Sequence, residues 1–487
     1  MKKVNIIGAG ISGLVTGIYL RKKGYEVYIY EKKPCSGGRI LNDGSRKFKG
    51  IALNQYIRGI QDDSEYNKIL EELGINTDIL EKMNYFKKIV FENGDEITIP
   101  LGKIRLERFL MSLSLGDIKK VKSLFDDLEY VDEYRYLQTK TKPRQLWVKS
   151  DYIKFYMLNR KLLKKIRYYE KKEVEVYLDS LESRKLREVI RVLTNKKASM
   201  LYLLDNILEL SKDDYAQING GIEVLINSLE NKFLELKGKI VFNSDVKRIL
   251  VENNKNKIIL KNGEKKEADI VICSVDGFYS LVHLLEEKNI NKDFDKLFLD
   301  GDLFDSYVIV VLLVDKKIKT NCKFVRHILK KPFIDPTGAF HKKFDMYISE
   351  KDDKTIISVY IRGNYDYWKK SYKSKVSDYN LNKILIGRRI TEELIKRGYN
   401  IEEKIEKLEV ITPYEYYKEN NVWRGVGRGW IPTPKFYNKI FKNTLSNAEG
   451  IYFCGQWINI GADISKIIKN SKELANIIYE KDNIKWK

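Results

Sequence analysis

A glycine-rich turn between a short apolar strand and a helix is the feature that most constrains this sequence. The hydrophobic pattern predicts a β-strand at residues 3–7, a turn at 8–13, a helix at 14–23 and a second strand at 26–30. Gly24 ends the helix, so the second strand follows at once. A strand–turn–helix–strand unit of this kind is half of a doubly wound parallel sheet, which predicts an α/β fold.

The turn itself follows the pattern G-x-G-x-x-G. Gly8 permits the tight turn, Gly10 leaves space for a pyrophosphate to approach the backbone, and Gly13 lets the helix pack closely on the strand. The exposed N–H groups and the positive dipole end of the helix favour a pyrophosphate at the same place. Ile11 and Ser12 are therefore candidate contacts as well.

An acidic residue, Glu31, ends the second strand. A carboxylate at this place can accept hydrogen bonds from both hydroxyl groups of a ribose, and it disfavours a ribose that carries a 2′-phosphate. A glycine turn without a ligand is the structural alternative, but it leaves the acidic residue and the complete unit around the turn unexplained. The N-terminal residues therefore predict a site for a dinucleotide.

The composition is that of a globular chain of two or three domains. Of 487 residues, 43% are hydrophobic and 32% are charged. The longest unbroken apolar run, residues 307–314, is far shorter than the about 20 residues that span a membrane. The four cysteines lie far apart without a C-x-x-C pair, and there are three histidines. We therefore expect no disulfide framework, no metal site, and a reducing, cytoplasmic environment.

The net charge is +22, from 90 basic and 68 acidic residues. Such a charge suits a nucleic acid or an anionic membrane, while lysines spread over the whole chain are also what a biased base composition would produce. The sequence contains no recognisable nucleic-acid-binding motif, so we expect no nucleic-acid partner. An anionic membrane surface fits the charge better, with the basic stretch 161–172 as the candidate contact. The expected location is cytoplasmic, peripheral at the inner face of the membrane.

Two further motifs carry a resemblance to a known family. Residues 36–40 read S-G-G-R-I, a second glycine turn with a positive charge beside the predicted phosphate site. Residues 452–457 read Y-F-C-G-Q-W and are followed by Gly461 and a predicted helix that starts near Ile464. Together with the first turn, these motifs resemble those of the FAD-dependent phytoene desaturases, carotenoid isomerases and retinol saturases, which belong to the flavin amine oxidase superfamily.

The resemblance implies FAD as the cofactor and identifies residues that bind it. Weaker matches at residues 220–222, 245–249, 268–271, 412–413 and 425–434 follow in the family's order. In the family, the residue matching Val246 meets the adenine through its backbone. The candidate cofactor-binding residues are Gly8, Gly10, Ile11, Ser12, Gly13, Glu31, Gly38, Arg39, Val246, Gly455, Asp463 and Ile464.

The same resemblance implies two domains. A discontinuous Rossmann-like domain for FAD would be assembled from residues 1–100, 211–290 and 412–487. A substrate domain would combine a helical, membrane-facing part at residues 101–210 with a mixed sheet at 291–411. Apolar runs at 305–314 and 355–361 predict strands of that second sheet.

By resemblance, the chain is expected to be an oxidoreductase that transfers hydride between flavin N5 and a C–C or C=C bond. Its substrate would be a long, apolar small molecule of carotenoid or isoprenoid type. Two alternatives stay open: a flavin amine oxidase or protoporphyrinogen-oxidase-like enzyme, and an escort-type lipid-binding protein of the same fold without flavin chemistry. The catalytic residues stay unknown, because His283, His327 and His341 form no acid–base pattern.

The start of the last helix departs from the family pattern. Where relatives commonly carry three glycines and a proline, residues 461–465 read G-A-D-I-S, and residues 48–59 also differ from the carotenoid enzymes. Asp463 is predicted to cap the helix by accepting from the N–H group of Ser465 or Lys466. A carboxylate at the flavin edge would repel the reduced flavin, so we expect Asp463 to lower the midpoint potential. The alternative is a cap that points away from the flavin.

Overall fold

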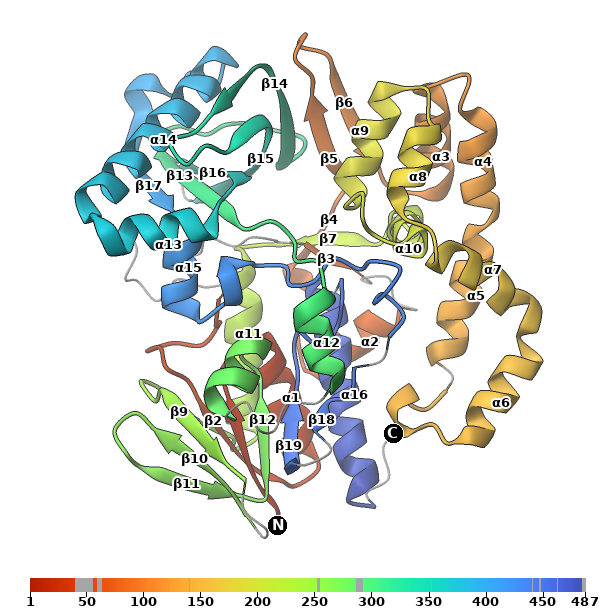
Figure 1. Ribbon diagram of the computed structural model, residues 1–487, viewed down its shortest axis with the longest axis vertical. Coiled ribbons are helices and arrows are strands. Elements are labelled where there is room, and N and C mark those ends of the chain that lie inside the picture. The colour runs from red at the N-terminus through yellow and green to blue at the C-terminus, as the bar shows by residue number, and fades with distance from the viewer. Residues whose placement is uncertain are drawn as a thin grey trace.

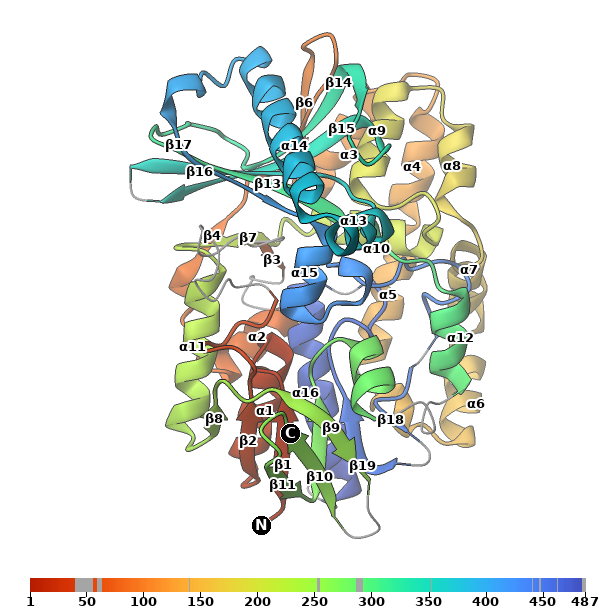
Figure 2. The same cartoon turned by 60° about the vertical axis from the view of Figure 1, so that its left-hand side comes forward.

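A computed structural model of the chain describes residues 1–39, 56–58, 64–139, 141–251, 255–285, 292–351, 353–439, 441–445, 448–461 and 463–483. In these residues the strands form four sheets; some helices cover the faces of the two largest, and others form a group of their own (Figures 1 and 2). Ile40 of the second glycine turn, Ala462 and most of the stretch 48–59 lie outside the described residues.

A six-stranded sheet occupies the lower half of the molecule and joins three remote parts of the chain (Figure 1). Its strands, in spatial order, are β18 (Thr444–Leu445), β19 (Ala448–Phe453), β12 (Ile270–Cys273), β1 (Lys3–Ile7), β2 (Glu26–Tyr30) and β8 (Lys239–Val241). The strands from β19 to β8 pair in parallel, whereas β18 runs antiparallel to β19. This arrangement confirms the predicted parallel, discontinuous sheet, and β1 and β2 have the predicted bounds.

Both faces of this sheet are covered. Helices α1 (Ile11–Lys22), α11 (Ile222–Glu235) and α16 (Ile464–Lys481) pack on one face. A three-stranded antiparallel sheet of β9 (Val246–Leu250), β10 (Asn256–Leu260) and β11 (Lys265–Ala268) packs on the other face together with α12 (Lys292–Asp300). All four residues of β12 are buried, as expected for a parallel strand between two layers.

Seven strands form the second large sheet, which extends from the upper left to the top centre of Figure 1. Their spatial order is β17 (Ile405–Ile411), β13 (Tyr307–Val314), β16 (Lys354–Arg362), β15 (Phe340–Lys351), β14 (Phe324–Ile334), β5 (Tyr85–Val90) and β6 (Glu96–Pro100). The strands predicted at 305–314 and 355–361 are confirmed as β13 and β16. Helices α13 (Tyr365–Ser374), α14 (Val376–Lys396) and α15 (Pro413–Asn420) pack on one face.

The second sheet corrects the predicted domain division at residue 100. Strands β5 and β6 were assigned to the FAD domain, but β5 pairs in parallel with β14 of the second sheet, and β6 pairs with β5. The helix α12, assigned to the substrate domain, packs against the six-stranded sheet. Pairing between strands that are remote in sequence leaves no local pattern, which is why the division was misplaced.

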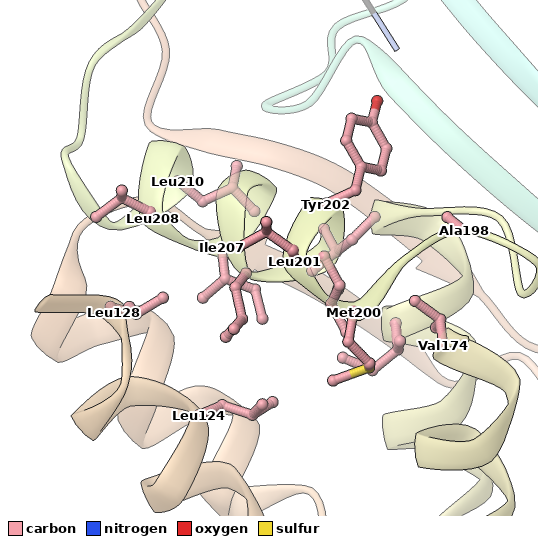
Figure 3. Close-up of a cluster of buried hydrophobic side chains, with 14 of the residues drawn as sticks. Leu124, Leu128, Val174, Ala198, Met200, Leu201, Tyr202, Ile207, Leu208 and Leu210 are labelled. Atoms are coloured by element: carbon pink, nitrogen blue, oxygen red, sulfur yellow. The ribbon is translucent and has the colours of Figure 1, made fainter. Parts of the chain in front are cut away.

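Residues between 103 and 211 form the predicted helical part, at the right of Figure 1. Its helices are α3 (Lys103–Ser112), α4 (Ile118–Asp126), α5 (Leu128–Thr139), α6 (Lys149–Leu158), α7 (Arg160–Glu170), α8 (Val174–Ser180), α9 (Arg184–Leu193) and α10 (Met200–Ser211). Nearly all side chains of α10 are buried, so this helix forms the centre of the group. Figure 3 shows Leu201, Ile207 and their apolar neighbours gathered around it, while Tyr202 points away from that cluster.

A small antiparallel sheet lies where the three parts meet (Figure 1). It consists of β3 (Tyr56–Arg58), β7 (Tyr215–Ile218) and β4 (Leu80–Lys82). Helix α2 (Glu65–Glu72) packs beside the parallel sheet. Among the described residues, no helix has both the length and the apolar character that crossing a membrane requires.

Candidate functional site

A cavity of about 1010 Å³ begins at the carboxyl ends of β1, β12 and β19 and extends to the seven-stranded sheet. In open α/β sheets, ligands bind at this end of the strands. Eleven of the twelve predicted cofactor-binding residues line the cavity: Gly8, Gly10, Ile11, Ser12, Glu31, Gly38, Arg39, Val246, Gly455, Asp463 and Ile464. The structure therefore brings together residues from all three predicted parts of the FAD domain.

The glycine turn has the geometry that its sequence predicts. Gly8 has a φ of +101°, which L side chains rarely adopt. A Cβ at Gly13 would lie 2.1 Å from the carbonyl oxygen of Gly8, so glycine here allows α1 to pack on β1. A Cβ at Gly10 would meet no atom within 4 Å and would project into open space. The space beside Gly10 fits a pyrophosphate at the start of α1.

Glu31 presents a fixed carboxylate to the same cavity. The residue is buried, one carboxylate oxygen accepts from the N–H group of Ala9 (2.8 Å), and the other accepts from that of Lys33 (3.0 Å). These bonds hold the carboxylate against the glycine turn. Each oxygen keeps a further acceptor position, which is what the hydroxyl groups of a ribose require.

The second glycine turn packs directly on the first. Gly37 donates its N–H to the carbonyl of Ala9 (2.9 Å), and Gly38, with a φ of +59°, lies against Gly10. Arg39 follows and donates a hydrogen bond to the side-chain oxygen of Gln456, next to Gly455. Arg39 thereby links the N-terminal turn to the closing motif predicted from the sequence.

Donors without a partner line the cavity near Gly455. Within the part of the chain that the structure describes, Nε2 of Gln456 and Nε1 of Trp457 are buried and lack a hydrogen-bond acceptor. Buried donors are rarely left unpaired in a folded protein. The open space at Gly10, the carboxylate of Glu31 and these free donors together fit a dinucleotide with a polar, acceptor-rich ring such as FAD. The assignment of individual residues to that cofactor stays a prediction.

Asp463 caps the last helix as predicted. One carboxylate oxygen accepts from the N–H group of Lys466 at 3.0 Å, at the start of α16. The other oxygen pairs with the guanidinium of Arg58, which the sequence analysis did not identify. The backbone of Arg58 is tied to the same helix, because its N–H donates to the hydroxyl oxygen of Ser465 (2.8 Å).

Asp463 and Arg58 belong to a buried charge network, which consists among the described residues of Arg58, Arg135, Lys466, Asp205, Glu209 and Asp463. Arg135 and Lys466 bind Asp205 with N–O distances of 3.0 and 2.7 Å. Burial alone would raise the pKa of Asp205, but the positive charges of Arg135 and Lys466 hold that pKa well below its ordinary value. Three positive and three negative groups make the network neutral.

Replacing Asp463 with asparagine is expected to raise the midpoint potential of the bound flavin. The substitution leaves the network with one surplus positive charge beside the helix start, which favours the more negative, reduced flavin. An effect of about 0.5–2 kcal/mol corresponds to about 10–45 mV for a two-electron couple. Spectroelectrochemical titration measures it, with Asp482→Asn at the far end of the helix as control. An unchanged or lower potential in D463N would show that the carboxylate does not act on the flavin.

Aromatic rings form the walls of the upper part of the cavity. Tyr56, Phe86, Tyr215 and Phe324 contact one another with ring-centroid distances of 5.4–5.9 Å. Tyr202, which points away from the apolar cluster in Figure 3, lines the same space. Rings in edge-to-face and tilted contact build a rigid surface that excludes water and offers apolar faces to a ligand.

Charged side chains lie among these rings. Arg326 forms two parallel hydrogen bonds with the carboxylate of Asp345 (2.8 and 2.7 Å), and Lys87 lies 2.9 Å from the same carboxylate. The sheet register explains the cluster, because Arg326 on β14 lies opposite Asp345 on β15, and β14 also pairs with β5, which carries Lys87. Sequence reasoning missed these residues, since each is a single charged residue in an ordinary strand.

The histidines have structural roles where their contacts are described. His327 is buried with its Nε2 atom 2.9 Å from the hydroxyl oxygen of Tyr399, and burial lowers its pKa to about 3. His341 lines the cavity, with Nε2 2.9 Å from Asp335. Asp335 also accepts from the N–H group of Thr337 in the β14–β15 turn, so this pair holds the hairpin.

Asp276 is a buried carboxyl group at the cavity wall that sequence reasoning also missed. It accepts from the N–H groups of Tyr279 (3.0 Å) and Trp423 (3.1 Å). Burial raises its pKa to about 7, although these hydrogen bonds and the charge of Arg39 act in the opposite direction. Asp276 thus joins the loop after β12 to the segment that precedes the closing motif.

Comparison with known proteins identifies a family that the chain matches. A family model described as flavin containing amine oxidoreductase matches residues 11–278, more than half of the chain. The 4,4′-diapophytoene desaturase (4,4′-diaponeurosporene-forming) of Staphylococcus aureus (strain Newman) is 23% identical over 284 residues, which is 56% of this chain and 55% of that protein. The chain therefore spans about half the length of the curated relatives it matches.

Solved structures share the whole fold at low identity. An oxidoreductase from Methanosarcina mazei has a TM-score of 0.57 at 16% identity, over 97% of this chain and all of that chain. Putrescine oxidase bound to putrescine has a TM-score of 0.59 at 13% identity, over 98% of this chain and 99% of that one. Cyclohexylamine oxidase from Brevibacterium oxydans has a TM-score of 0.57 at 13% identity, over 99% of both chains. These likenesses establish the architecture of the two sheets and the helical part.

Proposed function

The chain belongs to the flavin-containing amine oxidoreductase family, and on this premise we propose that it is an FAD-dependent oxidoreductase acting on a C–C or C=C bond of a long substrate with an apolar, isoprenoid-like body. The observation that carries the proposal is the continuous cavity, which leads from the predicted FAD turn to a space walled by aromatic rings. When bound, FAD supplies hydride transfer at its N5 atom.

The residues of the chain supply position and a dry environment. The turn at Gly10, the carboxylate of Glu31 and the start of α16 would hold FAD along the lower part of the cavity. The rings of Tyr56 and Tyr215 would hold the substrate body and keep water from it. Exclusion of water strengthens every electrostatic contact in the cavity.

The charge of the cavity favours this reading over oxidation of an amine. Lys87 and Arg326 share the single carboxylate of Asp345, and Arg428 adds a further positive charge to the cavity lining. A cationic amine would be repelled at the distances found within one cavity, because Coulomb forces are weakly screened away from water. Similarity to the desaturase of Staphylococcus aureus supports a carbon–carbon substrate as well.

An escort-type lipid carrier without flavin is the other alternative. The open space at Gly10 and the fixed carboxylate of Glu31 favour a bound dinucleotide over an empty carrier. The purified protein should be yellow, or become so on addition of FAD. The protein would then be mixed anaerobically with isoprenoids and polyenes, once with oxidised and once with photoreduced flavin. In one of the two mixtures the substrate should reduce the oxidised flavin or oxidise the reduced one. Primary amines and polyamines should leave both forms of the flavin unchanged. Bleaching by an amine would establish the amine oxidase alternative, and a protein that takes up no FAD would establish the carrier.

We further propose that helix α6 rests on an anionic membrane surface. Its side chains Ile153, Met157 and Leu158 are 60%, 75% and 72% exposed. Next to them, Lys161 and Lys164 of α7 are exposed, while the apolar side chains of α7 are buried in the helical part. An exposed apolar strip flanked by lysines is typical of a helix that lies in the headgroup region. The basic stretch 161–172 would therefore act together with α6.

Replacing Met157 and Leu158 with serine is expected to release the protein from anionic liposomes. Full burial of an apolar side chain contributes about 1.5–3 kcal/mol. Losing two such side chains should therefore lower the partition coefficient between liposome and water at least tenfold. Sedimentation at low salt measures the binding, which should also fall as salt rises. Ile384→Ser on α14, a substitution of another half-exposed side chain, is the control. Equal sedimentation of M157S/L158S and the parent protein would rule out this contact.

A further inference from the structure

Arg428 brings a positive charge into the upper part of the cavity without a partner for it. Its side chain lines the cavity and is exposed there, and its guanidinium lies 4.4 Å from the centroid of the Phe304 ring. Within the residues that the structure describes, Arg428 has neither an ion pair nor a hydrogen bond from its side chain. Because the guanidinium is exposed to the cavity and unpaired, its N–H donors are available to a ligand.

A second positive charge comes from the cluster of Lys87, Arg326 and Asp345. The two cations share one carboxylate, which leaves the cluster with a surplus charge of one. Burial lowers the pKa of Lys87, and the charges of Arg326 and Arg428 act in the same direction against the attraction of Asp345. Arg428, Lys87 and Arg326 all line the one cavity, so together they form a positive region.

Three other cations that line the cavity have acidic partners. Arg362 pairs with Asp305 at 3.0 Å, and Lys197 pairs with Asp302 at 2.7 Å. Lys343 lies 3.7 Å from Glu188, and burial, with the charge of Arg326, lowers its pKa to about 8. These three cations are therefore compensated in a way that Arg428 and the Lys87–Arg326 pair are not.

We propose that this region binds an anionic end of the substrate, a carboxylate or a phosphate carried on a long apolar body. Arg428 would donate to the anionic oxygens, the surplus charge of Lys87 and Arg326 would attract the same end, and the rings of Tyr56 and Tyr202 would contact the body. The inference rests on the proposed function, because the two share one cavity. It adds that the substrate is an amphiphile rather than a hydrocarbon.

A series of probes with one polyene body and different ends tests the proposal. Equilibrium dialysis of the FAD-loaded protein would measure the Kd of retinoic acid, retinyl phosphate, retinol and retinylamine. We expect at least one of the two anions to bind about tenfold or more tightly than retinol, and retinylamine to bind weakest. Whichever of the two anions has the lower Kd identifies the preferred end as a carboxylate or a phosphate.

Arg428→Met keeps the length of the side chain and removes its charge. R428M should lose the preference for an anion while its Kd for retinol stays unchanged. Arg362→Met is the matched control, because Arg362 lines the cavity but is already paired, and it should keep the preference. Flavin content and Tm of both variants show whether they are folded.

The outcomes separate this inference from the proposed function. If the protein holds FAD but binds retinol as tightly as both anions, if no probe binds, or if R428M keeps the preference, the anionic site is overturned and the flavin assignment stands. If the protein takes up no FAD and still prefers an anion in dialysis, the anionic site stands and the proposed function fails.

Discussion

Gly10→Val protein is expected to fold and to contain no flavin. Gly10 has extended backbone angles (φ −76°, ψ 175°) that valine adopts readily, and its Cβ would meet no protein atom within 4 Å. The branched side chain would instead occupy the space at the start of α1 where the pyrophosphate is predicted to bind. The expected effect is complete loss of the visible flavin spectrum, with an unchanged circular dichroism spectrum.

Two further glycine variants serve as controls for this result. Gly10→Ala adds a single methyl group to the same space and should retain part of the flavin. Gly13→Ala should instead lower the yield of soluble protein, because its Cβ would lie 2.1 Å from the backbone of Gly8. If Gly10→Val purifies with a full complement of flavin, the turn is not the phosphate site.

Arg58→Met is expected to cost about 3–5 kcal/mol of folding stability. Arg58 is only 3% exposed, and its removal takes the partner of Asp463 and one of the two cationic partners of Glu209, which leaves the buried network with a surplus negative charge. An unpaired buried charge is far more costly than an absent pair. Urea unfolding measures the change, and Arg105→Met, at an exposed pair with Asp213, should change stability by about 0.5 kcal/mol or less.

A double substitution makes the second prediction sharper. Arg58→Met combined with Glu209→Gln removes the surplus negative charge of the network, so it should recover part of the stability that R58M loses. The pKa of Glu209 is lowered in the folded protein by Arg135 and Arg58, in spite of burial. Its contribution is therefore present above the unfolded pKa of about 4.3 and is lost as the pH falls. Equal stability of R58M and the parent protein would show that the network does not stabilise the fold.

Much of the lower half of the molecule was predictable because its signals are local. The strands Lys3–Ile7 and Glu26–Tyr30 have the predicted bounds, and α16 begins where its pattern indicates. The helix α1 begins at Ile11 rather than at the predicted residue 14, since its first turn is part of the glycine motif itself. The glycines act on their immediate backbone, so their spacing alone predicts the turn.

The upper part of the cavity was not predictable in this way. Lys87, Arg326, Asp345 and Arg428 come from four separate segments, and none belongs to a motif. Only the register of β5, β14 and β15 makes three of them neighbours. Arg58 was missed for the same reason, because its carboxylate partners come from α10 and from the start of α16.

The sequence by itself therefore determined the parallel sheet, the dinucleotide turn and the family resemblance, all of which depend on residues close together in the chain. The tertiary structure alone decided the charge of the cavity and the partner of Asp463. Both depend on which side chains long-range strand pairing and helix packing bring within a few ångströms of one another, away from water. At such distances a single unpaired arginine, such as Arg428, affects the electrostatic potential in the cavity more than the overall charge of the chain does.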